Sequence, residues 1–164
     1  MGNEERISIN ISDFQSSDLA TIQNTNESYN GLPVIEIAAG APNVGVSKTI
    51  DVIPSDDTYT FGLWMKMKGD SQAQFVYLLL DTAPLNTDDF SVPKSVRKFD
   101  LTSEWKYCAV SRFFDNTPNS VTATIYPAGV QSGTVTTVGL ITKVASGLPV
   151  GPVVLASGAE LIKV

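Results

Sequence analysis

The sequence contains no histidine and a single cysteine, and charged residues make up only 17% of it. Without histidine, no side chain has an unperturbed pKa suited to acid–base chemistry near neutral pH. The lone Cys108 excludes an intrachain disulfide. A catalytic thiol needs a basic partner, usually histidine, to form its thiolate. We therefore expect Cys108 to be a small, unreactive core residue.

Other signs of enzyme active sites are also missing. The sequence has no G-x-S-x-G elbow, no glycine-rich phosphate loop and no cluster of metal ligands. Two carboxylates facing each other across a cleft can hydrolyse glycosides. Glu36, Asp81 and Glu104 are available for that role, and nothing in the sequence pairs them. The sequence therefore predicts a protein without catalytic residues, not an enzyme.

Charge and hydropathy argue against two classes of partner. The net charge of −6 gives a surface that repels phosphate backbones. Lys94, Arg97 and Lys98 form the only basic cluster of the sequence, which we interpret as a solvated loop. No apolar run approaches the roughly 20 residues of a membrane span, and no signal peptide is recognisable. We expect neither nucleic-acid binding nor membrane insertion.

The sequence does contain short segments in which polar and apolar residues alternate, and turn residues separate these segments. Such segments predict strands at 6–12, 33–39, 45–53, 58–68, 75–81, 96–101, 105–114, 121–126, 133–144 and 153–161. With no convincing helix, this pattern predicts an all-β fold, a two-sheet antiparallel β-sandwich of the jelly-roll type. The length of 164 residues fits one domain spanning residues 1–164.

Two local predictions accompany this strand pattern. Residues 13–28 are polar, and we expect a loop with one helical turn there, continuing as a loop through 24–30. Residues 69–71 predict a tight turn that pairs segments 58–68 and 75–81 as a hairpin. The segment 75–81 contains VYLLL, which is apolar on both faces and is therefore expected in the middle of a covered sheet.

The segment 58–68, TYTFGLWMKMK, is the most informative part of the sequence. One set of alternate residues is wholly apolar, and the other is polar with Trp64 in its middle. Because successive side chains of a strand point to opposite faces, this is a half-buried antiparallel strand. An indole on the solvent face, beside small neighbours, can meet a flat ligand such as a pyranose ring.

Four segments in order resemble the jelly-roll carbohydrate-binding modules of the galactose-binding-like type. They are Ile35–Ile37, Tyr59–Lys66, Thr102–Val110 and Leu155–Leu161, and the resemblance covers roughly residues 30–162. Such modules occur in polysaccharide hydrolases and in phage tail and baseplate proteins. The resemblance implies a jelly roll that binds a saccharide without catalysis, and it places Trp105 in the core.

Five residues are the candidate saccharide-binding site: Trp64, Tyr126, Lys66, Arg112 and Tyr77. Tyr126 shares the polar face of its strand with two threonines, so we expect it to be exposed. Lys66 and Arg112 are expected on the solvent face, where they can donate to sugar hydroxyls or acidic groups. Tyr77 shares a face with Phe75 and Leu79, which favours the core. For each residue a plain structural role remains the alternative.

No cofactor is expected, apart from a possible structural calcium ion. The pairs Asp56-Asp57 and Asp88-Asp89 can supply oxygen ligands, although ordinary turn chemistry also explains them. The leading hypothesis is a module that binds cell-surface or cell-wall saccharide for phage host adhesion. Two alternatives stay open: a structural virion protein that contacts other virion proteins or its own copies, and a domain of a larger secreted hydrolase. The expected location is accordingly the virion or the cell exterior.

Overall fold

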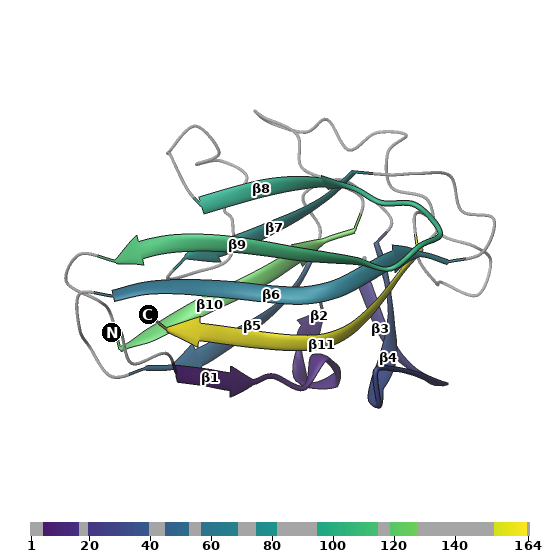
Figure 1. The fold of residues 1–164 in the computed structure, drawn as a ribbon, viewed down its shortest axis with the longest axis horizontal. Coiled ribbons are helices and arrows are strands. Elements are labelled where there is room, and N and C mark those ends of the chain that lie inside the picture. The colour runs from purple at the N-terminus through teal and green to yellow at the C-terminus, as the bar shows by residue number, and fades with distance from the viewer. Residues whose placement is uncertain are drawn as a thin grey trace.

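The computed structural model describes residues 5–16, 20–39, 45–52, 57–68, 75–81, 95–114, 119–127 and 153–163. These residues form eleven strands and one short 3-10 helix (Figure 1). In chain order the elements are β1 (Glu5–Ser8), η1 (Ile11–Asp13), β2 (Gln15–Ser16), β3 (Ala20–Tyr29), β4 (Leu32–Ala39), β5 (Val46–Asp51), β6 (Asp57–Met67), β7 (Phe75–Asp81), β8 (Ser95–Asp100), β9 (Lys106–Phe114), β10 (Ser120–Tyr126) and β11 (Val153–Lys163).

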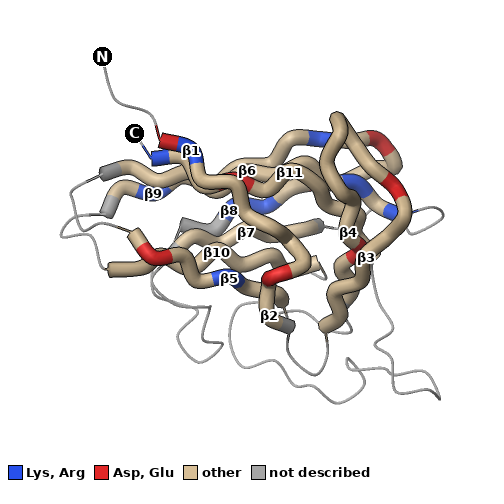
Figure 2. Tube along the Cα trace, turned by 90° about the horizontal axis from the view of Figure 1, so that it is seen from below, with Lys and Arg blue, Asp and Glu red and all other residues tan. Residues whose placement is uncertain are grey.

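The strands form two antiparallel sheets that pack face to face. Sheet A has the order β3-β4-β11-β6-β9, with β1 paired to β11, and sheet B has the order β2-β5-β10-β7-β8. Figure 2 shows the two layers nearly edge-on, with β1, β6, β9 and β11 lying over β5 and β10. The predicted all-β sandwich is confirmed. No helix in the described part of the chain is long and apolar enough to cross a membrane.

The core lies between the sheets and is built from the apolar alternates of their strands. Tyr59, Phe61, Leu63, Met65 and Met67 of β6 are all between 0% and 2% exposed. Sheet B contributes the buried apolar residues Val76, Leu78, Leu80, Val121, Ala123 and Ile125 to the same cluster. Full burial of one such aliphatic side chain is worth about 1.5–3 kcal/mol. The alternation of β6 therefore fixes which of its faces points away from the core.

The predicted hairpin between 58–68 and 75–81 is wrong. Strand β6 pairs with β11 and β9 in sheet A, whereas β7 pairs with β10 and β8 in sheet B. The two strands of the predicted hairpin therefore lie in opposite sheets. Turn-forming residues in the sequence do not indicate whether the chain stays in one sheet or crosses to the other. Their backbone preferences are the same for a hairpin turn and for a connection between sheets. The expectation that β7 lies centrally and is covered is confirmed.

The amino-terminal region also differs from the prediction. Strand β1 ends at Ser8, and the 3-10 helix Ile11–Asp13 follows, so the expected strand 6–12 is shorter. The Asn10 side chain accepts a hydrogen bond from the backbone N–H of Ser12 at 3.1 Å and thereby caps that helix. Residues 20–29 form strand β3 in place of the expected loop. The predicted strand at 133–144 lies outside the described residues.

Candidate functional site

Four aromatic side chains meet on the outer face of sheet A, and we call them the aromatic cluster: Tyr29, Trp64, Trp105 and Tyr107. Tyr29 stacks on Trp105 with a centroid separation of 4.4 Å and an interplanar angle of 19°. Trp64 makes edge contacts with Tyr29 at 5.5 Å and with Tyr107 at 5.3 Å. Trp64 is half-buried and faces away from the core, as predicted.

A two-residue turn brings Tyr29 into this cluster. Asn30 and Gly31 have φ values of 52° and 78° and join β3 to β4. Positive φ at both central positions is the mark of the tight type I′ hairpin turn, which Asn-Gly favours. The buried Ser157 of β11 donates a hydrogen bond from Oγ to the carbonyl oxygen of Pro33 at 2.9 Å. This contact fixes the hairpin tip against the sheet.

Small residues beneath the cluster let its rings lie close to the sheet. A Cβ at Gly62 would come within 2.7 Å of Tyr107 Cζ, so only glycine leaves room for that ring. Gly158 has φ +67° and lies at an irregularity of the β11–β6 pairing, between Ser157 and Glu160. Its Cβ would lie 3.6 Å from Trp64 Cδ1. The bulge brings Glu160 to the outer face beside Tyr107.

A carboxylate with two donors borders the cluster. Arg6 Nη1 lies 2.9 Å from Glu160 Oε1, and the Tyr107 hydroxyl donates a longer hydrogen bond of 3.3 Å to the same oxygen. Partial burial, and then the negative charge of Glu160, raise the pKa of Tyr107 above its usual value. The phenol therefore stays protonated and remains a donor. Both contacts fall on Oε1 of a partly exposed side chain.

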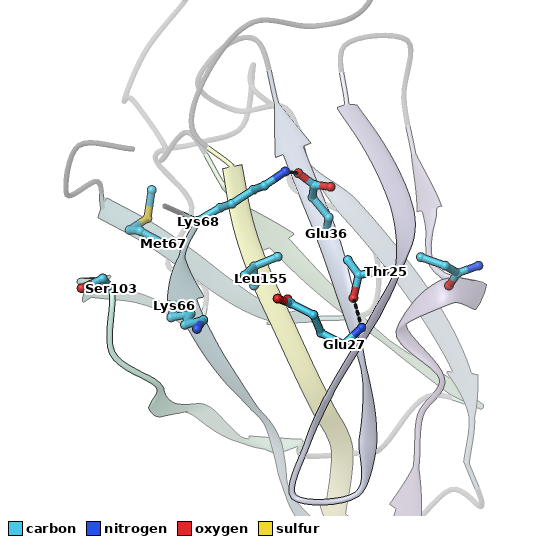
Figure 3. A pocket seen from close by; sticks show the side chains of 9 residues that line it. Thr25, Glu27, Glu36, Lys66, Met67, Lys68, Ser103 and Leu155 are labelled. Carbon is cyan, nitrogen blue, oxygen red and sulfur yellow. Dashed lines mark hydrogen bonds and ion pairs between the residues drawn. The ribbon is translucent and has the colours of Figure 1, made fainter. Parts of the chain in front are cut away.

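A polar groove of about 550 Å³ continues from the cluster between the β3–β4 hairpin and the residues before β9. Its lining residues are Asn24, Thr25, Glu27, Glu36, Lys66, Met67, Lys68, Ser103 and Leu155. Figure 3 shows Lys66 and Ser103 on one side, and Thr25 and Glu27 on the other. Lys68 Nζ pairs with Glu36 Oε1 at 2.6 Å. Lys66 joins groove and cluster, because its Nζ lies 5.0 Å from the Trp105 ring centroid.

The structure corrects the placement of Trp105 and Arg112. Trp105 is half-buried in the aromatic cluster and not in the core. Its segment has the opposite phase to the one expected, since Cys108 and Val110 are the buried alternates. Arg112 lies opposite Tyr59, whose side chain is in the core, and directly opposed residues share a face. The expectation that Arg112 lies on the solvent face with Trp64 is therefore wrong.

Tyr126 and Tyr77 lie on the other side of the sandwich. Both point away from the core on sheet B, where they are directly opposed in β10 and β7. The expected exposure of Tyr126 is wrong, because it is 2% exposed. The expected core position of Tyr77 is also wrong, because the core alternates of β7 are Val76, Leu78 and Leu80. Neither tyrosine can contact a ligand that lies on Trp64.

Cys108 is buried in the core, as predicted. Burial raises the pKa of its thiol to about 11, which disfavours the reactive thiolate. Of the calcium candidates, Asp56, Asp88 and Asp89 lie outside the described residues, and Asp57 begins β6. Within the ranges described, no three His, Cys, Asp or Glu side chains are grouped to hold a metal ion.

Sequence reasoning missed Tyr29, Tyr107, Glu160 and Arg6 as members of this face. For Tyr29 a signal was present, because Asn30-Gly31 is the strongest short-range hairpin motif. For Tyr107 no clear signal was present, because the segment 105–114 is apolar on both faces and alternation does not set its phase. The pairing of Arg6 with Glu160 joins residues 154 positions apart, and no local pattern reports it.

The sequence matches no protein-family model and no curated protein. Solved structures are similar in fold. The CBM22-1 xylan-binding domain from Paenibacillus barcinonensis Xyn10C has a TM-score of 0.62 at 10% identity, covering 92% of this chain and 85% of that one. TmCBM61, in complex with β-1,4-galactotriose, has a TM-score of 0.53 at 12% identity, covering 92% and 88%.

A third similar structure is the enzymatically active domain of bacteriophage CBA120 tailspike protein 4. It has a TM-score of 0.53 at 9% identity, and the match covers 93% of this chain and 19% of that one. At such low identities a likeness shows the fold alone. The chain therefore has the jelly-roll fold found in carbohydrate-binding modules.

Proposed function

We propose that this protein is a noncatalytic carbohydrate-binding module and that the outer face of sheet A is its binding site. The observation that carries the proposal is the aromatic cluster around Trp64, which adjoins a polar groove of about 550 Å³. Ligand sites combine apolar or aromatic walls with a few polar groups that fix orientation. The likeness of the scaffold to a xylan-binding domain and to a module in complex with β-1,4-galactotriose supports saccharide as the ligand.

Each part of the site matches one part of a sugar. The C–H face of a pyranose ring packs on the Trp64 indole, with Tyr107 at its edge. Sugar hydroxyls donate to the Glu160 carboxylate and accept from the Lys66 ammonium. Tyr29 borders the indole, and Trp105 stacks on Tyr29. Because the residues come from β3, β6, β9 and β11, a rigid sheet holds the site in place.

Binding to soluble polysaccharides, measured by calorimetry beside a panel of variants, tests the proposal. We expect Trp64→Ala to lose binding while the far-ultraviolet circular dichroism spectrum stays unchanged. Phe113→Ala is the matched control, because Phe113 is a 58% exposed aromatic residue further along the outer face of β9. Unchanged affinity of a folded Trp64→Ala variant would exclude this site.

Host adhesion on a phage tail or baseplate is the biological role we propose for such binding. The similarity to a bacteriophage tailspike domain supports it, and the virion is then the location. A fluorescent fusion should label bacterial cells, and soluble polysaccharide should compete for the label. Labelling that resists competition and survives Trp64→Ala would contradict this role.

A structural assembly role is the second candidate, and exposed apolar side chains favour it. Leu32, Tyr107 and Phe113 are 48%, 39% and 58% exposed. Exposed aromatic residues are common anchors of protein interfaces. In this case the protein should form concentration-dependent oligomers with blue-shifted tryptophan emission. A monomer at all concentrations, in which Trp64 emission responds to saccharide, would exclude this candidate.

A further inference from the structure

Three cations accompany the aromatic cluster and the groove, and they differ in their partners. Arg6 pairs with Glu160 at 2.9 Å, and Lys68 pairs with Glu36 at 2.6 Å. Lys66 makes no ion pair within the part of the chain that the structure describes. Its ammonium instead lies over the Trp105 ring, 5.0 Å from the centroid. Lys66 therefore carries the uncompensated positive charge at the junction of cluster and groove.

The position of Lys66 makes this charge available to a ligand on Trp64. Both side chains leave the same face of β6, two residues apart, and Lys66 also lines the groove. Lys66 is half-buried, so part of its hydration is already lost. A ring contact of this kind stabilises a cation only weakly where solvent is near. A charge-assisted hydrogen bond to an anion would add to that stabilisation.

Acidic residues elsewhere do not cancel this local charge. Glu36 is neutralised by Lys68, and Glu160 by Arg6. Glu27 lines the groove from the hairpin side, but it is exposed and hydrated (Figure 3). The net charge of −6 acts over longer distances, which salt screens beyond about 8 Å at physiological ionic strength. Lys66 is therefore the cation of this face whose charge no carboxylate within the described residues offsets by an ion pair.

We propose that Lys66 makes the site selective for saccharide chains that carry an anionic substituent on the sugar lying against Trp64. The substituent is a carboxylate, as in a uronic acid, or a sulfate ester, since both accept hydrogen bonds from an ammonium group. This inference rests on the proposed carbohydrate-binding function and adds the ligand class to it.

The test compares charged and neutral forms of the same polymer. One pair is a uronic-acid polysaccharide and its carboxyl-reduced form, and the other is a sulfated polysaccharide and its desulfated form. We expect the anionic member of at least one pair to bind about three- to fivefold more tightly, and the preference to shrink as salt is added. The pair that shows the preference identifies the anion.

Charge variants then assign the preference to Lys66. Lys66→Gln should abolish the preference by lowering the affinity for the anionic form more than the affinity for the neutral form, because a glutamine amide can still donate to sugar hydroxyls but carries no charge. Lys48→Gln is the matched control, because it removes the same charge from β5 in sheet B and should keep the preference. Glu27→Gln should increase the preference slightly, since it removes the exposed carboxylate across the groove.

The outcomes separate this inference from the function on which it rests. Equal binding of charged and neutral forms, with both lost in Trp64→Ala, overturns the anion preference and leaves the carbohydrate site intact. A preference that survives Lys66→Gln also overturns it. Binding that Trp64→Ala leaves unchanged, or no binding to any of the four polymers, overturns both proposals.

Discussion

The outer faces of the two sheets start from the same sequence pattern and end in different environments. Strand β6 carries Trp64 among small and polar alternates, and β10 carries Tyr126 beside Thr122 and Thr124. Both aromatic residues point away from the core. Trp64 remains half-exposed in the aromatic cluster, whereas Tyr126, Thr122 and Thr124 are at most 2% exposed. Facing away from the core is therefore not the same as facing solvent.

This difference explains which candidate residues form a site. On sheet A, Trp64, Lys66 and Trp105 come together beside the groove. On sheet B, Thr49 and Thr122 hydrogen-bond to each other at 3.0 Å, and Leu79 is fully buried. The middle of this face, along β10 and β7, is therefore largely buried and stabilises the fold, whereas Thr49 on β5 is exposed. The following predictions test the contrast, from the largest effect to the smallest.

Replacing Tyr126 should damage stability and not binding. Because the ring is buried, we expect Tyr126→Ala to lower the free energy of unfolding by about 3 kcal/mol. Urea denaturation followed by circular dichroism measures this change, with Tyr77→Ala as the half-buried partner for comparison. A loss below about 1 kcal/mol would mean that the outer face of sheet B is open, which would remove the contrast.

Replacing Trp64 should damage binding and not stability. We expect Trp64→Ala to weaken saccharide binding by about 10- to 100-fold, which is the range for a central aromatic contact. Trp105→Ala should weaken it less, because Tyr29 and Lys66 already contact that ring. Calorimetric titration gives both affinities. A larger loss of affinity in Trp105→Ala than in Trp64→Ala would show that the sugar ring packs on Trp105 and not on Trp64.

Gly62→Ala tests whether the position of the Tyr107 ring on the outer face of sheet A affects binding without affecting stability. The added methyl group would collide with the end of the Tyr107 side chain, whose Cζ would lie at 2.7 Å. That side chain can move, so we expect stability to change by less than about 1 kcal/mol. Affinity should fall about fivefold, since the Tyr107–Glu160 contact is lost.

The control for this variant is Thr60→Ala, two residues earlier on the same face of β6. It removes the hydrogen bond between Thr60 and Ser111 without touching the aromatic cluster. Binding of Thr60→Ala should match that of the wild type. Unchanged affinity in Gly62→Ala would show that Tyr107 does not contact the saccharide.

The smallest effect is a dependence of stability on alkaline pH. Burial raises the folded-state pKa of Cys108 to about 11, above the value of about 9 that a solvated thiol has. The native state therefore holds this proton while the unfolded state releases it, and stability falls as pH rises from about 9 to about 11. Denaturation across this range should be less pH-dependent in Cys108→Ala. If the free energy of unfolding depends on pH equally in the wild type and in Cys108→Ala, the thiol has the same pKa in the folded and unfolded states.

Much of the fold follows from local alternation. Strands β4 to β11 lie within a few residues of their predicted ranges, and the apolar alternates of β6 form the core as expected. Strand β3 was not predicted because its second half is polar, from Gln23 to Ser28. Its conformation depends on pairing with β4, and a hydrogen bond from Thr25 Oγ1 to the Val34 carbonyl bridges the irregular part.

The site was predicted only in part. Alternation identified Trp64 and Lys66, because both oppose the unbroken apolar face of their own strand. It failed for Trp105 and Arg112, because the segment 105–114 is apolar on both faces and its phase is ambiguous. Pairing with β6 resolves that phase: Tyr107 is opposite Trp64, and Arg112 is opposite Tyr59.

The sequence by itself determined the all-β character, the inward face of β6 and the position of Trp64 opposite the core. These follow from periodicity two, which depends on the backbone of one strand alone. The tertiary structure decided that Tyr29 contacts both Trp64 and Trp105, that Arg6 reaches Glu160, and that Tyr126 is buried. These outcomes depend on which strands pair and which faces are covered, and residues far apart in sequence set both.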